Sequence, residues 1–192
     1  MDAANVDLKG FTEGFYQKYT NSSIQPVLET LEYIKKKTST WLEITTLLIP
    51  GLNDSEHDLR AMTEWIVKTL GPEVPLHLTA FLPSHKMPDF PYMPPERLII
   101  ARKTALHSGL RHVYTGNIRD PKGQATYCRK CGGTLIGRDG FEIIEWGFKE
   151  KARCKVCSTV CSGVFEEKPG TWGSKRLQIQ LPKEKNYRPP RH

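Results

Sequence analysis

Residues 1–117 repeat one pattern, in which a short run of β-forming residues is followed by a turn and an amphipathic helix. Helices of this length supply the long crossovers that parallel strands need. The pattern therefore predicts an α/β fold with a parallel sheet. We expect strands at 5–9, 41–49, 76–82 and 111–117, and helices at 25–37, 56–70 and 94–108.

Each predicted strand has an apolar side and a polar side. The polar side carries Asp7 and Lys9 in the first strand, Glu43 and Thr45 in the second, and His77 in the third. An ordinary doubly wound sheet is apolar on both faces. The polar side therefore indicates either the lining of a barrel or curved sheet that holds a polar ligand, or an incomplete sheet with one solvated face.

The predicted sheet has an unprotected edge. Four strands and three helices do not close a parallel barrel, and the chain starts directly on the strand at 5–9. A free edge exposes unpaired backbone groups that favour pairing with another strand. We expect this edge to pair with a missing N-terminal half of a barrel or to self-associate.

Five cysteines lie between positions 128 and 161. Cys128 and Cys131 form one CxxC pair, and after 22 intervening residues Cys154 and Cys157 form a second pair. Two such pairs are typical of a zinc-ribbon or rubredoxin-like site that holds one tetrahedral metal ion. We favour zinc over iron, and two free or redox-active pairs are the alternative. Cys161 could extend the second pair into a cluster motif, but we interpret it as a small buried residue.

The net charge of +7, from 28 Lys and Arg against 21 Asp and Glu, is concentrated at the C-terminus. Residues 167–192 contribute +5 of this charge, so the rest of the chain is nearly neutral and a nucleic-acid-binding face is not expected. No apolar run approaches the roughly 18 residues of a transmembrane helix, and the N-terminus lacks a secretory pattern. We expect no membrane partner, a cytoplasmic location, and disorder in the basic tail.

Several stretches resemble radical SAM enzymes, in particular the pyruvate formate-lyase activating enzyme type. The run NVDLKG at 5–10 is similar to the DLK strand of that group, LLIPGLND at 47–54 to its PGxND turn, and LPSH at 82–85 to its LPxH element. Together with VYTGN at 113–117 and the double CxxC, these motifs resemble the AmmeMemoRadiSam system radical SAM enzyme over residues 3–166.

The resemblance implies a partial β/α barrel whose lumen binds S-adenosylmethionine (SAM) beside a [4Fe–4S] cluster. It places Asp7 and Lys9 at the SAM site and His85 near the nucleoside part of SAM. Without the resemblance, Asp7 and Lys9 are interpreted as a solvated ion pair and His85 as an exposed loop residue. The CxxxCxxC cluster motif and the Gly-Gly-Glu strand of the family are absent from these 192 residues.

We therefore expect three parts: half of a radical SAM barrel at 1–120, a four-cysteine zinc-ribbon-like module at 121–166, and the basic tail at 167–192. The first hypothesis is the C-terminal portion of a radical SAM enzyme that is inactive alone. SAM and [4Fe–4S] would belong to the complete enzyme only, whose substrate is unknown and could be a protein. The alternative is a non-catalytic, four-cysteine metal-binding interaction module with a basic tail.

Overall fold

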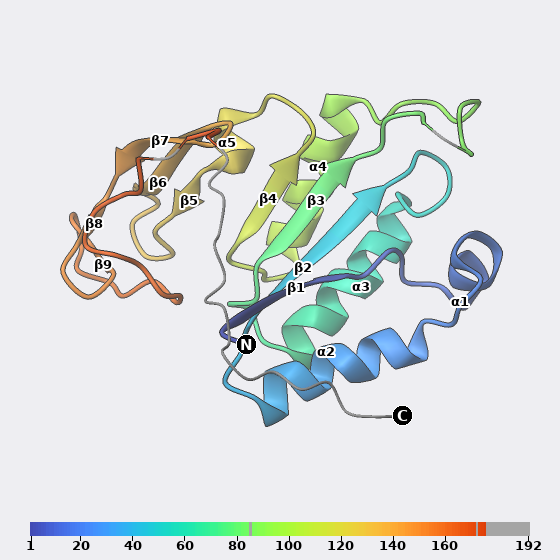
Figure 1. The fold of residues 1–192 in the computed structure, drawn as a ribbon, viewed down its shortest axis with the longest axis horizontal. Helices are drawn as coiled ribbons and strands as arrows, with labels where there is room; N and C mark the ends of the chain where they lie inside the picture. The colour runs from blue at the N-terminus through green and yellow to red at the C-terminus, as the bar shows by residue number, and fades with distance from the viewer. Residues whose placement is uncertain (85, 172, 176–192) are drawn as a thin grey trace, which may run out of the picture.

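The computed structural model describes residues 1–84, 86–171 and 173–175. Its larger part is a four-stranded parallel sheet in the order β1-β2-β3-β4. The strands are β1 (Ala3–Asp7), β2 (Trp41–Leu48), β3 (Leu76–Ala80) and β4 (Val113–Gly116). The parallel α/β arrangement predicted from the sequence is thus confirmed (Figure 1).

Helices connect these strands. The short α1 (Glu13–Phe15) and the π-helical turn η1 (Tyr16–Thr20) precede α2 (Gln25–Lys37), and α3 (Glu56–Thr69), α4 (Pro95–His107) and α5 (Pro121–Gln124) follow. Local signals fix several ends: the Ser55 hydroxyl accepts from the Asp58 amide at 3.1 Å and begins α3. Pro95 stands at the first position of α4, where its missing N–H costs nothing. The three longer helices agree closely with the predicted ranges.

One predicted strand was displaced. We expected a strand at 5–9, but β1 spans Ala3–Asp7 and pairs with β2 from Ala3↔Trp41 to Asp7↔Thr45. The amide of Leu8 still bonds to the Thr45 carbonyl at 3.0 Å, whereas the Lys9 amide turns to the Tyr16 hydroxyl. The ladder with β2 therefore ends at Leu8, and the Lys9 amide, which faces away from β2, is satisfied by a side chain.

The two sides of the sheet differ as the sequence predicted. Along β2, buried and half-exposed residues alternate strictly, with Leu42, Ile44 and Leu48 packed into the main core. On the opposite side, Asp7, Thr45, His77 and Tyr114 stand in one row across the four strands. This polar row lies on the side of the sheet away from that core.

The cysteine-bearing region forms a second, smaller part. A three-stranded antiparallel sheet contains β5 (Thr126–Tyr127), β6 (Thr134–Asp139) and β7 (Glu142–Trp146), and a hairpin contains β8 (Phe148–Lys149) and β9 (Arg153–Cys154). We call residues 126–166 the cysteine module. Its core is small and consists of Leu135, Ile136, Phe148 and three cysteines. In Figure 1 the module lies beside β4, away from α2 and α3.

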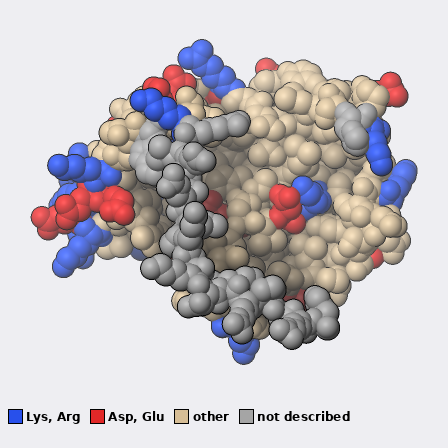
Figure 2. Space-filling view, in the orientation of Figure 1, with Lys and Arg blue, Asp and Glu red and all other residues tan. Residues whose placement is uncertain are grey.

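Among the described residues, no helix has both the length and the apolar character to cross a membrane. Figure 2 shows one face of the molecule, on which most charged side chains stand around the periphery. Most of the tail for which we expected disorder, including 176–192, lies outside the described residues.

Candidate functional site

Asp7 and Lys9 meet at the carboxyl end of β1. The Lys9 ammonium lies 2.8 Å from the Asp7 carboxylate, and the two side chains are 42% and 52% exposed. The structure therefore confirms that the two residues form a pair at a strand end. Because both side chains keep about half of their surface free, each can also contact a ligand or another part of the protein.

The backbone beneath this pair is held in place. The Thr46 hydroxyl donates to the Leu8 carbonyl at 2.8 Å, and the Lys9 amide donates to the Tyr16 hydroxyl at 3.0 Å. Tyr16 is 2% exposed, and burial raises the pKa of its hydroxyl, so the group stays neutral. The segment that carries the ion pair is therefore preorganised.

Asn53 joins this segment to the turn that follows β2. Its side-chain amide donates to the carbonyls of Lys9 at 2.7 Å and Leu47 at 2.8 Å, and its side-chain oxygen accepts from the Ile49 amide at 2.7 Å. Asn53 is 5% exposed. A side chain with two donors and one acceptor is required here, which asparagine supplies. The PGLND run therefore owes its asparagine to structure, a role that the sequence motif alone did not reveal.

The other polar residues of β2 and β3 are brought together in part. Glu43 pairs with His77 at 2.7 Å and accepts from the Trp41 indole at 3.0 Å. The hydrogen bond from His77 lowers the pKa of the Glu43 carboxyl. Thr45 instead donates to Asn5 across the sheet at 2.8 Å. His85, which the resemblance places near SAM, lies outside the described residues.

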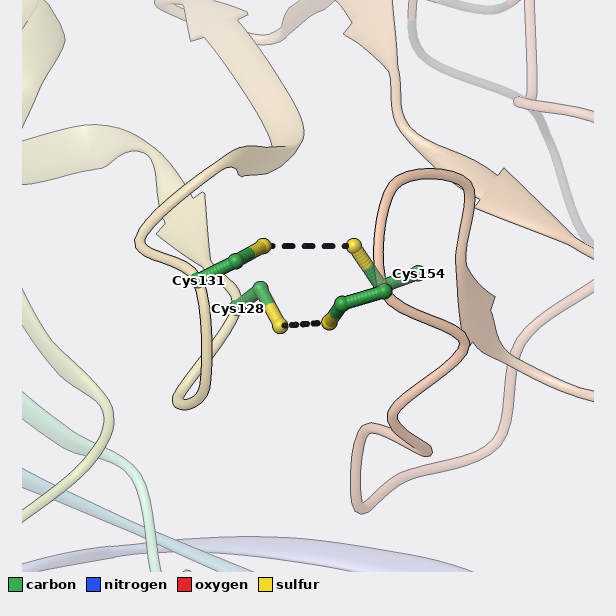
Figure 3. A group of neighbouring side chains, drawn as sticks. Cys128, Cys131 and Cys154 are labelled. Atoms are coloured by element: carbon green, nitrogen blue, oxygen red, sulfur yellow. Dashed lines mark hydrogen bonds between the residues drawn. The ribbon is translucent and has the colours of Figure 1, made fainter.

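The four cysteines of the two CxxC pairs gather into one group (Figure 3). The Sγ atoms lie 3.4 Å apart for Cys128 and Cys157 and 3.7 Å apart for Cys131 and Cys154, and all four lie within 4.8 Å of one another. A tetrahedron with metal–sulfur bonds of about 2.3 Å has sulfur atoms about 3.8 Å apart. The group therefore fits one four-thiolate metal ion.

Two similar backbone turns present these thiols. In the first, the Gly132 amide donates to the Cys128 carbonyl at 2.9 Å, and in the second the Ser158 amide donates to the Cys154 carbonyl at 2.9 Å. Gly132 and Ser158 both have a positive φ, of 70° and 61°. The residue after each CxxC therefore adopts a left-handed conformation, for which a small side chain is suited.

The environment of the group favours the thiolate form of two ligands. Hydrogen bonds from the Cys157 and Val156 amides lower the pKa of the Cys154 thiol. The Thr159 hydroxyl lies 3.3 Å from the Cys157 sulfur, and hydrogen bonds from this hydroxyl and from the Thr159 amide lower the pKa of the Cys157 thiol to about 6.

Cys161 stands apart from the four-cysteine group and is 8% exposed. Burial raises the pKa of its thiol to about 11, in agreement with a buried, unreactive cysteine.

Comparison with solved structures decides the fold. A domain of the pyruvate-formate lyase-activating enzyme from Bacteroides vulgatus matches with a TM-score of 0.50 and 18% identity, over 59% of this chain and 66% of that one. A radical SAM methyltransferase from Sphaerobacter thermophilus matches with a TM-score of 0.50 and 14% identity, over 59% of this chain and 33% of that one. The fold is radical SAM-like. At these identities the radical SAM likeness concerns the fold alone.

At the level of sequence, no family model matches the chain. An uncharacterized protein of Methanocaldococcus jannaschii is 41% identical over 159 residues, which cover 82% of this chain and 47% of that protein. The chain thus spans about half the length of this curated relative.

The cysteines do not fit a radical SAM cluster. The resemblance requires three cysteines in a CxxxCxxC loop that leaves one iron open to SAM, and this motif is absent from the sequence. In the described part of the chain, four of the five cysteines instead form a closed group. These residues therefore supply a site for a single metal ion rather than for a SAM-binding cluster.

Proposed function

We propose that this chain is the C-terminal portion of a radical SAM enzyme of the AmmeMemoRadiSam type, and that the carboxyl end of β1 contacts SAM. The single observation that carries this proposal is the Asp7–Lys9 pair on the polar side of a radical SAM-like sheet. In β/α barrels and open α/β sheets, ligands bind at the carboxyl ends of the strands. The pair stands at such an end.

The two side chains have complementary uses in this role. The Lys9 ammonium can donate charge-assisted hydrogen bonds to the carboxylate of SAM, and the Asp7 carboxylate can accept from its amino or hydroxyl groups. The hydrogen bonds from Asn53 and Thr46 would hold both residues in position before SAM arrives. The complete enzyme would use a [4Fe–4S] cluster held outside these residues to cleave SAM reductively.

The free edge of β1 is where the remainder of a barrel would pair. Within the described residues, β1 has β2 as its only neighbouring strand. An unpaired edge is a template for pairing with another strand, because its N–H and C=O groups lack partners. We propose that an N-terminal half-barrel covers this edge in the complete enzyme.

The test is SAM binding and anaerobic 5′-deoxyadenosine formation by a completed protein, with the N-terminal half supplied. Lys9→Ala should weaken SAM binding by roughly 10- to 100-fold, because one charge-assisted hydrogen bond contributes about 1.5–3 kcal/mol. Asp7→Asn should weaken binding as well. Lys35→Ala, at an exposed position on α2, should leave it unchanged.

Two results would contradict the proposal. If the 192-residue chain alone forms 5′-deoxyadenosine after iron–sulfur reconstitution, the chain is not an incomplete enzyme. If Lys9→Ala binds SAM normally in the completed protein, the assignment of the β1 end to SAM is wrong, although the fold stands.

We further propose that the four-cysteine group holds a structural zinc ion, with iron as the alternative. Four protein thiolates leave no position for water or substrate, which is the arrangement of structural rather than catalytic zinc sites. The small core of the module supports a structural role, because few apolar side chains are available to hold it together.

A further inference from the structure

A cavity lies between the polar side of the sheet and the cysteine module. Its volume is about 860 Å³, a size that suits a small organic molecule. The cavity wall combines aromatic and charged side chains from both parts of the chain, among them Trp41, Glu43, His77, Tyr114, Arg138 and Phe165.

One side of the wall is a polar network on β2 and β3. Both oxygens of the Glu43 carboxylate are occupied, one by the Trp41 indole at 3.0 Å and the other by His77 Nε2 at 2.7 Å. An ionised Glu43 requires that His77 Nε2 carries a proton. His77 Nδ1 has no hydrogen-bond partner in the part of the chain that the structure describes, so it remains available to a molecule in the cavity.

The wall also contains a cation, Arg138, whose charge acts on Glu43 but which lies too far from it for an ion pair. The Arg138 guanidinium lies 5.6 Å from the centre of the Tyr114 ring, and its Nη1 donates to the Gln124 carbonyl at 2.8 Å and the Thr126 hydroxyl at 3.0 Å. No Asp or Glu within the described residues forms an ion pair with it. A half-buried guanidinium with free N–H groups favours an anionic partner.

Aromatic rings lie between these two polar groups. The Tyr114 ring stacks on the His77 ring, with centroids 5.1 Å apart and planes inclined by 28°. The wall also contains the rings of Trp41 and Phe165. Because the Tyr114 ring is already engaged by His77 and Arg138, the rings of Trp41 and Phe165 are the ones that offer contact to a further flat ring.

We propose that this cavity binds a small planar aromatic molecule that carries one anionic group, with its ring against the aromatic wall and its anion at Arg138. Carboxylate, sulfonate and phosphate share the required chemistry. The site is separate from Asp7 and Lys9, because neither residue belongs to the cavity wall. The inference therefore does not depend on the proposed SAM-binding role.

The experiment uses two fluorescent probes and the full chain. 8-Anilino-1-naphthalenesulfonate is an aromatic anion, and N-phenyl-1-naphthylamine has the same rings without the sulfonate. We expect one saturable site for the anion. Arg138→Gln should weaken its binding by about tenfold or more while changing the binding of the neutral probe by less than about twofold. Arg119→Gln, whose side chain is 85% exposed and is not in the wall, is the matched control and should change neither.

A measurement on the unaltered chain keeps the test independent of how Arg138→Gln folds. In amide spectra, the anionic probe should shift Gly116 and Gly163, which line the cavity, and leave Gly14 and Gly51 unchanged. The absence of a saturable site, or shifts spread equally over all four glycines, would overturn the proposal. If a folded Arg138→Gln protein binds both probes more weakly, and by the same factor, the role of the anion would also be overturned.

Discussion

Replacing Asn53 with alanine tests whether the end of β1 is held by the turn after β2. The substitution removes three hydrogen bonds of 2.7–2.8 Å from a side chain that is 5% exposed. The loss of each hydrogen bond costs about 1 kcal/mol, and a buried group that is left without a partner costs about 1–3 kcal/mol. The two carbonyls keep a second lone pair, so we use the lower values. The free energy of unfolding should therefore fall by about 3 kcal/mol, a large part of the roughly 5–15 kcal/mol typical of proteins.

Urea unfolding followed by intrinsic fluorescence measures this loss. With a slope of about 2 kcal/mol per molar urea, the midpoint should fall by about 1.5 M. Asn5→Ala is the control, because it removes one exposed bond from Thr45 and should cost less than about 0.5 kcal/mol. Asn53→Asp keeps the acceptor but turns an oxygen toward two carbonyls, so it should be at least as destabilising as alanine. Equal midpoints for Asn53→Ala and Asn5→Ala, or a tolerated Asn53→Asp, would refute the reasoning.

Three further predictions follow from the metal group, a buried histidine and the sheet edge. Cys154→Ser should lose the bound metal and unfold the module, whereas Cys161→Ser should keep a full equivalent of metal per chain, as measured by elemental analysis. Full retention of the metal in Cys154→Ser would rule out this ligand set. Burial, with the nearby Arg111 charge, lowers the pKa of His112, so the unfolded chain binds a proton below about pH 6.5 that the folded chain does not. The free energy of unfolding should therefore fall as the pH drops below that value, and urea titrations of His112→Gln should lack this contribution; an unchanged pH dependence would contradict it. The β1 edge at Ala3–Asp7 should cause concentration-dependent association by sedimentation, and a monomer with slow amide exchange along the strand would contradict that expectation.

Local patterns predicted the helices and strands well. The spacing of apolar residues in 25–37 and 56–70 predicted α2 and α3, because a helix that packs on one side repeats its apolar residues every three or four positions. The Ser55 hydroxyl begins α3 through its hydrogen bond from the Asp58 amide. The strand at 5–9 was displaced by two residues, because its bounds depend on its register with β2, from Ala3↔Trp41 to Asp7↔Thr45, rather than on alternation.

The four-cysteine group was predicted for a chemical reason. A CxxC turn places two thiols side by side within a few residues, and the thiols of two such turns complete a tetrahedron. The structure confirms that Cys128, Cys131, Cys154 and Cys157 converge. The pattern says nothing about what surrounds them, so the Thr159 hydroxyl beside Cys157 was found only in the structure.

Spacing within a few residues sets the α/β pattern, the polar side of the sheet and the two cysteine turns, so all three could be predicted before the chain was seen folded. The folded chain was needed to show that Asn53 reaches the Lys9 carbonyl, 44 positions away, and that Glu43 pairs with His77, 34 positions away. The same holds for Arg138 of the module, which stands over Tyr114 of the sheet. Such contacts depend on the register between parallel strands and on how the module packs against them, which long crossovers leave open and only the packed core fixes.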